Sequence, residues 1–323
     1  MKFEFFKQQE NKREQTPALE QRLEQELKTQ YKTQAKALNQ AGILEILPNK
    51  EEIGVLGIDG KEYPIPTLEA IEQLIRQNPE KYQAKIEQGF SQVLMVPLAM
   101  PLDRQIEILK QNILKRHQEG KLLATKENPT DINEPLNLNI TDPVWVWDNW
   151  QGSDVSGQTV YFPKSFDKNN HQGKTKQELL NRQNNNQSPI PGWQVLLLES
   201  NPNIPAEGQG QTIGGRRQLE AGKTPNEYLK LLQTDPKYAN EQGLTIEAWL
   251  TLFISHLEQT NEVIDDYYGK GKIRYLTGSF YPSSTNLADG KWDRRNRRAR
   301  LNRSDPDDRN DYYGLRSAVG VET

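Results

Sequence analysis

Apolar residues near the N-terminus recur with the spacing of a long helix. Thr16-Pro17 supplies an N-cap and a first-turn proline, and a stripe with four- and seven-residue spacing follows it as far as Gly42. The opposite side of this stretch carries Glu, Gln and Lys. The stripe consists of Leu19, Leu23, Leu27, Tyr31 and Leu38. The pattern predicts an amphipathic helix that ends at the glycine.

Two more helices are predicted in the first third of the chain. Thr67 is a suitable N-cap for one of them, and Asn78-Pro79 is expected to end it. Asp103 is expected to cap the other, which stops near Gly120. We therefore predict a mainly helical N-terminal region over residues 1–125.

Strand patterns are short and lie mostly in the second part of the chain. A small hairpin with Asp59-Gly60 at its turn is predicted between residues 53 and 65. After residue 125 the content of Asn, Pro, Asp and Gly rises and tryptophans appear, which indicates a boundary. Further strands are predicted at residues 144–147, 159–162, 192–198, 273–281 and 314–321.

Two helices are predicted among these strands. Thr224 and Glu227 have the spacing of a capping box, with proline at the first helical position. Thr245 is expected to cap a longer helix that extends to about Asp266. Residues 181–187, NRQNNNQ, are interpreted as a polar loop. Together these elements predict an α+β domain over residues 126–323.

Composition argues against several classes of function. The 323 residues carry a formal net charge of −3, are 34% hydrophobic and 26% charged, and contain no cysteine and three histidines. Mean hydropathy is −0.87. Thiolate chemistry is thereby excluded, and scattered histidines disfavour a zinc site or a Ser-His-Asp triad. We expect a protein that is not an enzyme, with no cofactor and no metal.

The sequence also bears on membranes and compartment. It has no apolar run near 18 residues, so no membrane insertion is expected. The start, MKFEFFK, lacks the apolar stretch of a signal peptide. A cytoplasmic location is the resulting expectation, and the cell surface or a phage particle stays open.

Residues 291–313 differ from the rest of the chain. This stretch contains seven Arg, five Asp, three Asn and two Tyr, and few apolar residues. Trp292 lies at its start and the predicted strand from Gly314 follows it, so we expect both of its ends to be held and Trp292 to be a buried anchor. A disordered tail is the competing interpretation.

Two binding interpretations compete for the same stretch. An Arg-rich nucleic-acid patch is one, but the aspartates leave a local net charge of only +3, and phosphate binding gains from uncompensated cations. A protein-binding surface is the other, because Arg and Tyr are favoured at interface hot spots while Asn, Ser and Asp make adaptable hydrogen bonds. The composition favours the protein-binding surface.

The candidate ligand-binding residues are the polar and aromatic positions of this stretch, and we expect them to be mostly exposed on one surface. Tyr312 and Tyr313 are the expected energetic anchors, since tyrosine offers a large contact area at low entropy cost. The full set is Asp293, Arg295, Asn296, Asn302, Ser304, Asp305, Asp308, Asn310, Asp311, Tyr312 and Tyr313.

At these residues the chain resembles a known family. The run from Trp292 through the Arg- and Asn-rich stretch to Gly314-Leu315-Arg316 resembles the end of the formylglycine-generating-enzyme type of C-type lectin fold. It also looks like the variable protein of a diversity-generating retroelement, in which a reverse transcriptase rewrites adenine positions of a C-terminal repeat. Asn, Asp, Arg, Ser and Tyr are the residues that such rewriting yields. Residues 192–198, 214–222 and 262–266 look like the scaffold of these proteins.

The resemblance implies a C-type lectin-like domain, with small antiparallel sheets flanked by two helices and a variable segment at about residues 291–315. This chain departs from the family's enzymes, which need active-site cysteines. It departs from calcium-dependent lectins as well, because Arg294 stands where an oxygen donor is needed. Asp305, Asp307 and Asp308 are interpreted as solvated loop residues rather than a calcium site.

Other candidate sites have simpler interpretations. Gly208-Gln209-Gly210 and Gly214-Gly215 lack the strand–loop–helix order of a phosphate loop and are expected to be turns. Asp265-Asp266 is expected to face solvent rather than to form a catalytic pair. The tryptophans between residues 144 and 150 are expected to pack rather than to stack sugars.

These observations predict a non-catalytic receptor or adhesion-type protein whose C-terminal segment is diversified to vary its specificity. The ligand is expected to be a protein or surface, and the N-terminal helices offer a route to oligomers. Two alternatives stay open: a non-catalytic relative of the formylglycine-generating fold with a fixed ligand, and a nucleic-acid-binding module that uses the Arg-rich run.

Overall fold

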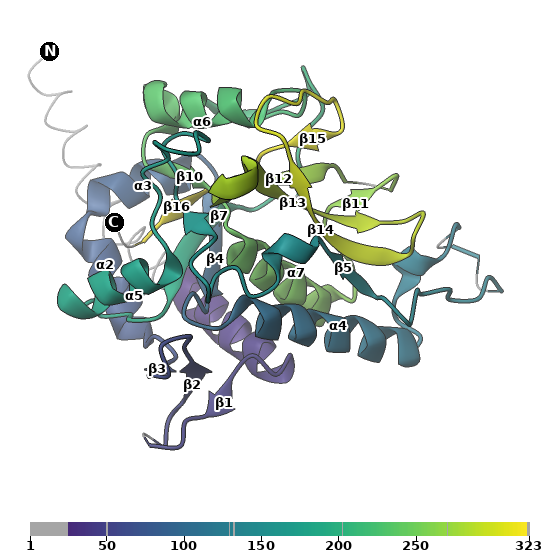
Figure 1. The fold of residues 1–323 in the computed structure, drawn as a ribbon, viewed down its shortest axis with the longest axis horizontal. Helices are drawn as coiled ribbons and strands as arrows, with labels where there is room; N and C mark the ends of the chain where they lie inside the picture. Colours follow the sequence, from purple (N-terminus) through teal and green to yellow (C-terminus); the bar gives the residue numbers. More distant parts are fainter. Residues whose placement is uncertain are drawn as a thin grey trace, which may run out of the picture.

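The computed structural model combines helices with several small sheets, in agreement with the predicted α+β class (Figure 1). It describes residues 25–49, 51–128, 130–131, 133–201, 203–269 and 271–321. The predicted start of the first helix at Thr16-Pro17 lies outside the described residues, and the helix is observed over residues 25–40. Gly42 follows with a φ of 80°, which confirms the predicted stop.

Short strands interrupt the helices of the first 125 residues. The predicted hairpin is confirmed, as is Thr67, whose side chain accepts a hydrogen bond from the Ala70 N–H. Asn78 ends its helix as predicted, but Pro79 begins another, since proline fits a first helical turn. The elements are β1 (Glu45–Ile46), β2 (Ile53–Leu56), β3 (Glu62–Pro64), α2 (Leu68–Gln77), α3 (Pro79–Glu87), β4 (Phe90–Val96) and α4 (Leu102–Gln118).

The strand β4 joins the two predicted regions. It pairs antiparallel with β7 (Gln194–Glu199) in a four-stranded sheet of order β10-β16-β7-β4, in which β10 spans Glu241–Gly243 and β16 spans Ser317–Gly320. The predicted boundary at residue 125 therefore does not separate two cores, because strands from both sides of it share one sheet and one apolar cluster.

A second, larger sheet carries the Arg-rich segment. Its order is β15-β12-β13-β14-β5, with β6 pairing β12 and β11 pairing β13. The strands are β5 (Val144–Val146), β6 (Val160–Tyr161), β11 (Asp266–Tyr267), β12 (Ile273–Tyr281), β13 (Asn286–Asp293), β14 (Arg298–Ser304) and β15 (Tyr313–Gly314). The predicted strands at 144–147, 159–162 and 273–281 are confirmed, with small differences at their ends.

The remaining helices correct two boundaries. The polar run 181–187 mostly continues the helix α5 (Lys176–Asn185), which a Thr175–Glu178 capping box begins and the buried Leu180 anchors. The predicted capping box of α6 (Pro225–Thr234) is confirmed. The long helix α7 (Ile246–Thr260) ends earlier than expected, at the left-handed Asn261. The minor elements are η1 (Leu123–Thr125), η2 (Asp148–Trp150), η3 (Pro236–Tyr238), η4 (Pro282–Ser284), β8 (Thr212–Ile213) and β9 (Arg216–Arg217).

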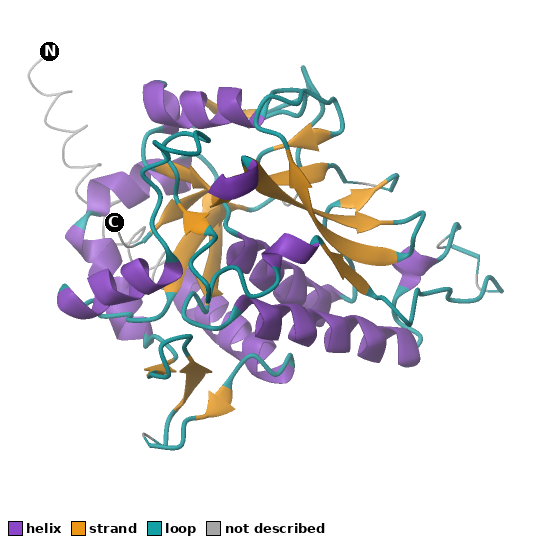
Figure 2. Cartoon of the chain, in the orientation of Figure 1, coloured by secondary structure: helices purple, strands orange, loops and turns teal. Residues whose placement is uncertain are grey.

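The core lies between the larger sheet and the helices α4 and α7. Figure 2 shows these helices on one side of the sheet, with α6 on the other side. Gly290 of β13 allows the ring of Trp249 on α7 to approach the sheet, since a Cβ at this glycine would lie 2.4 Å from the ring. Trp292 is fully buried in the same cluster, as predicted. Among the described residues, no helix has both the length and the apolar character that crossing a bilayer requires.

Candidate ligand-binding surface

Strand register divides the residues of the larger sheet between two faces. In β13, Gly290 and Trp292 face α7, so the residues that alternate with them face the opposite way. Antiparallel pairing places Asp293 beside Arg298, and Asp289 beside Asn302 of β14. We call the sheet face opposite α7 the outer face. It carries Trp145, Tyr267, Asp289, Lys291, Asp293, Arg300, Asn302 and Tyr313.

Charged side chains lie buried against the sheet on the outer face, namely Asp289, Lys291 and Asp293. Asp289 is fully buried and accepts a hydrogen bond of 2.8 Å from the Ser304 hydroxyl, while its other carboxylate oxygen has no hydrogen-bond partner within the described residues. Burial raises the pKa of Asp289 to about 6, although the Ser304 hydroxyl and the nearby Lys291 and Arg300 oppose the rise. The ionised form of this carboxyl therefore lowers the free energy of unfolding.

Asp293 is buried as well, but hydrogen bonds compensate for its burial. Burial alone would raise its pKa, yet the Asn296 side chain and backbone and the Arg300 guanidinium lower the pKa below its ordinary value. The Asn296 N–H and amide donate to it at 3.1 and 2.8 Å, and Arg300 donates at 3.2 Å. Asp293 thus holds the β13–β14 turn in shape.

Above this layer, aromatic rings connect parts of the chain that lie far apart in sequence. The Tyr267 and Tyr268 ring centroids are 4.0 Å apart, and Tyr312 meets Tyr267 edge-on at 5.7 Å. The Arg295 guanidinium lies 5.7 Å from the Tyr268 ring. Tyr268 and Tyr312 are 61% and 52% exposed, so this aromatic row offers apolar area to solvent. It links the hairpin turn at one end of the segment to the loop at the other end.

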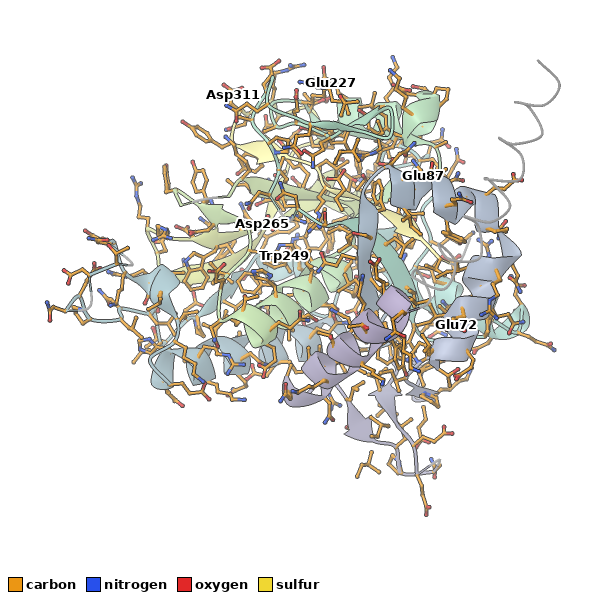
Figure 3. All side chains as sticks on the ribbon, turned by 180° about the vertical axis from the view of Figure 1, so that it is seen from behind. Glu72, Glu87, Glu227, Trp249, Asp265 and Asp311 are labelled. Atoms are coloured by element: carbon orange, nitrogen blue, oxygen red, sulfur yellow. The ribbon has the colours of Figure 1, made fainter. Side chains whose placement is uncertain are left out.

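The loop over residues 305–312 is fixed to the start of α6. The Asn226 N–H donates to the Pro306 carbonyl, and the Arg309 guanidinium donates to the Gly222 carbonyl and to Glu227. The Tyr275 hydroxyl, on the outer face, donates to the Asp308 carbonyl at 3.1 Å. Figure 3 shows Asp311 and Glu227 at the same end of the molecule. The loop therefore borders the outer face, and its aspartate side chains point to solvent.

Most of the predicted binding residues are exposed, two are half-buried and two are buried. Asn302 and Tyr313 are half-buried. Asp293 and Ser304 are only 4% and 9% exposed, which corrects the expectation for both, because each is held by a hydrogen bond within the sheet. The exposed residues are Arg295, Asn296, Asp305, Asp308, Asn310, Asp311 and Tyr312. We call these seven, with Tyr268, Asn302 and Tyr313, the display surface.

Sequence reasoning missed Tyr267 and Tyr268. These residues join the surface because β11 pairs in parallel with the end of β13, a contact between segments 25 or so residues apart that no local pattern reveals. The pair of tyrosines before Gly269, where a turn is expected, is the only signal that the sequence offers. At Tyr268 the backbone φ is 68°, which is unusual for a bulky residue.

The acidic pair Asp265-Asp266 corrects a second expectation. Asp265 is buried, accepts a hydrogen bond of 2.9 Å from the Trp249 indole and pairs with Arg274 at 2.6 Å. Asp266 is half-buried and pairs with Arg294 at 2.5 Å. Figure 3 shows Trp249 and Asp265 side by side. Both carboxylates therefore anchor the sheet and its turn.

Carboxylates compensate four of the arginines of the segment. Arg294 pairs with Asp266, and Arg298 pairs with Asp142. Arg300 lies over the Trp145 ring at 4.7 Å and donates to Asp293. Arg309 pairs with Glu227, so four of the seven arginines are in ion pairs, which reduces the charge available to attract a phosphate backbone.

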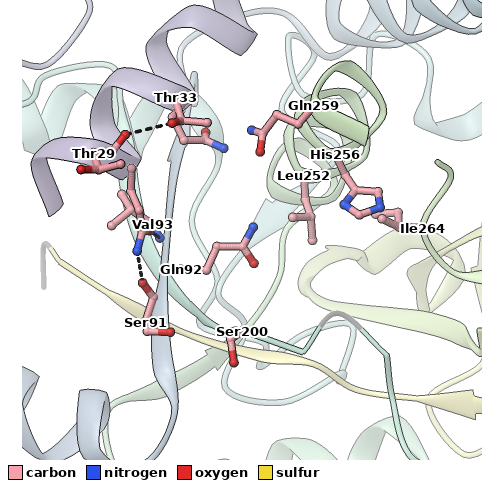
Figure 4. Close-up of a pocket in the computed structure, with 12 residues that line it drawn as sticks. Thr29, Thr33, Ser91, Gln92, Val93, Ser200, Leu252, His256, Gln259 and Ile264 are labelled. Atoms are coloured by element: carbon pink, nitrogen blue, oxygen red, sulfur yellow. Dashed lines mark hydrogen bonds between the residues drawn. The ribbon is translucent and has the colours of Figure 1, made fainter. Parts of the chain in front are cut away.

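A separate cavity of about 350 Å³ lies between the first helix, β4 and α7 (Figure 4). Amide and hydroxyl side chains line it, together with His256, whose pKa burial lowers. The Gln30 amide closes the edge of β4 by bonding to the Ser91 carbonyl and the Val93 N–H, each at 2.5 Å. His256 itself is half-buried on α7.

Among the residues that the structure describes, no three His, Cys, Asp or Glu side chains come together in a group that could hold a metal ion. Asp305, Asp307 and Asp308 instead face solvent. In comparisons with known proteins, no protein-family model, curated protein or solved structure matches this chain.

Proposed function

We propose that this chain is a non-catalytic ligand-binding protein, the variable protein of a diversity-generating retroelement, with a C-type lectin-like domain of the formylglycine-generating type. Its segment at about residues 291–315 would be rewritten to change the display surface. The partner is a protein or another macromolecular surface. The proposal rests on the resemblance of the C-terminal sequence and on the arrangement of that segment in the fold.

One observation carries the proposal: the segment alternates between buried anchors and exposed polar residues. Trp292, Ala299, Leu301 and Leu315 are at most 1% exposed and fix the backbone. Between them, the turn and the loop present exposed polar or aromatic residues, seven of which belong to the predicted binding set. Exposed substitutions usually change stability by less than about 0.5 kcal/mol, so such positions can change while the fold persists.

The chemistry of the display surface suits a protein ligand. Tyr268, Tyr312 and Tyr313 offer rigid rings with a polar tip, and Arg295 lies at the end of the aromatic row. Asn and Asp side chains around them offer donors and acceptors. The arginine pairing described above disfavours nucleic acid as the partner.

The gene's surroundings test the proposal directly. We expect a near-identical copy of the sequence that encodes residues 291–315, with a reverse transcriptase gene nearby, and we expect mismatches only where the copy has adenine. The relevant measurement is genomic sequencing of several isolates. A locus without a copy or a reverse transcriptase, and with this segment unchanged between isolates, would favour a fixed ligand and refute diversification.

A library tests the binding surface itself. Randomising Arg295, Asn296, Asp308, Asn310 and Tyr312 together and selecting on a panel of unrelated proteins should yield folded binders. A control library of five exposed positions on α2 and α3 should yield far fewer, because those helices offer no aromatic row. Equal yields from both libraries would contradict a dedicated display surface.

A further inference from the structure

The cavity between the first helix, β4 and α7 is open to solvent and large enough to hold a small molecule. Its volume of about 350 Å³ lies in the range of ligand sites. Exposed side chains, Thr33 and Gln259 among them, stand at its mouth, and the half-buried Gln92 and His256 lie deeper. Figure 4 shows Gln92 and His256 pointing toward each other across the space. The display surface uses none of these residues.

The lining of the cavity is uncharged. None of the described residues that line it is Asp, Glu, Lys or Arg. His256 does line it, but burial lowers the pKa of this histidine, so its ring is neutral at neutral pH. The nearby Glu262 and Asp265 raise the same pKa and Arg316 lowers it, so their effects oppose one another. A charged molecule would lose its hydration here without gaining an opposite charge at the wall, and the lining therefore favours a neutral occupant.

The wall formed by the first helix offers hydrogen-bond acceptors. The Thr29 hydroxyl donates to the Gln25 carbonyl at 2.8 Å, and the Thr33 hydroxyl donates to the Thr29 carbonyl at 2.9 Å. Each hydroxyl has only one proton, so its lone pairs are what it offers to the cavity. Both threonines are exposed, so an occupant can reach them. This wall therefore favours a molecule that presents N–H or O–H groups to the helix.

The wall formed by β4 offers a directed donor. The Arg316 guanidinium donates to the Gln92 Oε1 at 3.4 Å, which fixes this oxygen toward the arginine and leaves the Gln92 Nε2 to donate elsewhere. Arg316 is 3% exposed, so this contact lies behind the wall and not in the cavity. Neither the Gln92 Nε2 nor the His256 ring has a hydrogen-bond partner among the described residues. Gln92 thus presents N–H groups, and the neutral His256 ring presents one donor and one acceptor.

Apolar side chains close the bottom of the cavity. Val93, Leu252 and Ile264 are at most 4% exposed and come from β4, α7 and the segment that follows α7. Such a surface packs against the face of a ring, while the polar walls contact the edge of the ring. A donor wall and an acceptor wall around an apolar floor fit a flat molecule whose edge carries N–H and C=O groups side by side.

We propose that this cavity binds a small neutral heterocycle with a lactam edge, the chemical class of uracil and hypoxanthine. A carbonyl oxygen of the molecule accepts from the Gln92 Nε2, and its ring N–H groups donate to the hydroxyls of Thr29 and Thr33. The ring packs on Leu252, and His256 bonds to a further polar atom of the edge. The residues that line the cavity lie outside the segment 291–315, so the inference does not depend on the proposed function.

The test uses the full chain and isothermal titration calorimetry, with uracil and hypoxanthine as the probes. We expect at least one of them to bind with a Kd below about 1 mM. The fully N-methylated form of the base that binds keeps the ring and its carbonyl groups but has no N–H, so it should bind at least about tenfold more weakly. Benzoate, a flat anion of similar size, should not bind. In NMR spectra, the side-chain amide of Gln92 and the ring of His256 should shift on addition of the base.

Variants of the two walls complete the test. Gln92→Glu keeps an acceptor for Arg316 but replaces the donating N–H groups by a carboxylate oxygen, so binding should weaken at least about tenfold. Thr33→Val, an exposed change that leaves the core untouched, should weaken binding several-fold. Gln73→Glu, the same change as at Gln92 but at an exposed position of α2, is the matched control and should leave binding unchanged.

Four results would overturn the proposal. The first is no binding by either base, and the second is binding of the methylated base or of benzoate with equal affinity. The third is unchanged binding by both Gln92→Glu and Thr33→Val. The fourth is a set of NMR shifts at Tyr268 and Tyr312 in place of Gln92 and His256, which would place the base on the display surface.

Discussion

Replacing Asp289 by asparagine should stabilise the protein at neutral pH. The carboxyl is fully buried under the outer face, and burial raises its pKa from 3.8 to about 6. The folded state therefore holds its proton more tightly than the unfolded chain does. At a pH above both values, ionised Asp289 costs about 3 kcal/mol of folding free energy relative to its neutral form, from roughly two pKa units at about 1.4 kcal/mol each.

The pH dependence gives this prediction its sign. The stability that protonated Asp289 provides is complete below pH 4 and is lost as pH rises through about 6. Asp289→Asn has no such loss, and its side-chain oxygen can still accept the Ser304 hydroxyl. The difference in unfolding free energy between variant and wild type should thus grow by about 3 kcal/mol between pH 4 and pH 8.

Urea unfolding followed by circular dichroism at several pH values measures this difference. Other titrating groups are common to both proteins, so they cancel in the comparison. Asp305→Asn, an exposed change just after β14, is the matched control and should show a difference below about 0.5 kcal/mol at every pH. If the difference in unfolding free energy between Asp289→Asn and the wild type stayed constant with pH, the raised pKa of the buried Asp289 would be refuted.

Two core predictions follow from the same sheet. Trp292→Ala should lower the unfolding free energy by about 3–5 kcal/mol, and the half-exposed Trp145→Ala by clearly less; equal effects in urea melts would contradict the assigned anchor. Gly290→Ala should cost about 1–3 kcal/mol, because its methyl group would lie 2.4 Å from the Trp249 ring; an unchanged melting temperature would contradict this packing.

Local signals in the sequence predicted most of the elements that have local causes. The cap expected at Asp103 is wrong, because α4 begins one residue earlier, at Leu102, directly after Pro101. The cap at Thr67, the capping box at Thr224 and the turn at Asp59-Gly60 each depend on residues within four positions, and all were found. The strand predicted at residues 273–281 is observed as β12. Trp292 was predicted to be buried because apolar residues bracket the polar segment.

Elements with long-range causes were not predicted. The strand β4 is a short apolar run that periodicity cannot distinguish from a buried helix, and it is a strand because it pairs with β7. The polar run 181–187 continues a helix because Thr175 caps it and Leu180 is buried. Tyr267 reaches the display surface only through the pairing of β11 with β13. Each of these outcomes depends on a partner distant in sequence.

Contacts within the fold also decide which candidate binding residues are exposed. Asp293 and Asp308 are an example. Composition predicts exposure for both, yet Asp293 faces Arg298 across the hairpin and accepts three hydrogen bonds, while Asp308 is exposed on its loop. Asp293→Ala should therefore destabilise the protein by about 2–3 kcal/mol, since three hydrogen bonds to a charged acceptor are lost. Asp308→Ala should cost less than about 0.5 kcal/mol.

Urea unfolding of the two alanine variants separates these roles. The pKa of Asp293 is lowered, so the stability it provides should also be lost as pH falls below its ordinary range, and Asp293→Ala should remove that part of the acid dependence. If Asp293→Ala proved as mild as Asp308→Ala, both residues would belong to the display surface. If Asp293→Ala is strongly destabilising, a variable segment must retain Asp293 while other positions change. The surface available for new ligands is then restricted to the turn tip, the loop and the aromatic row.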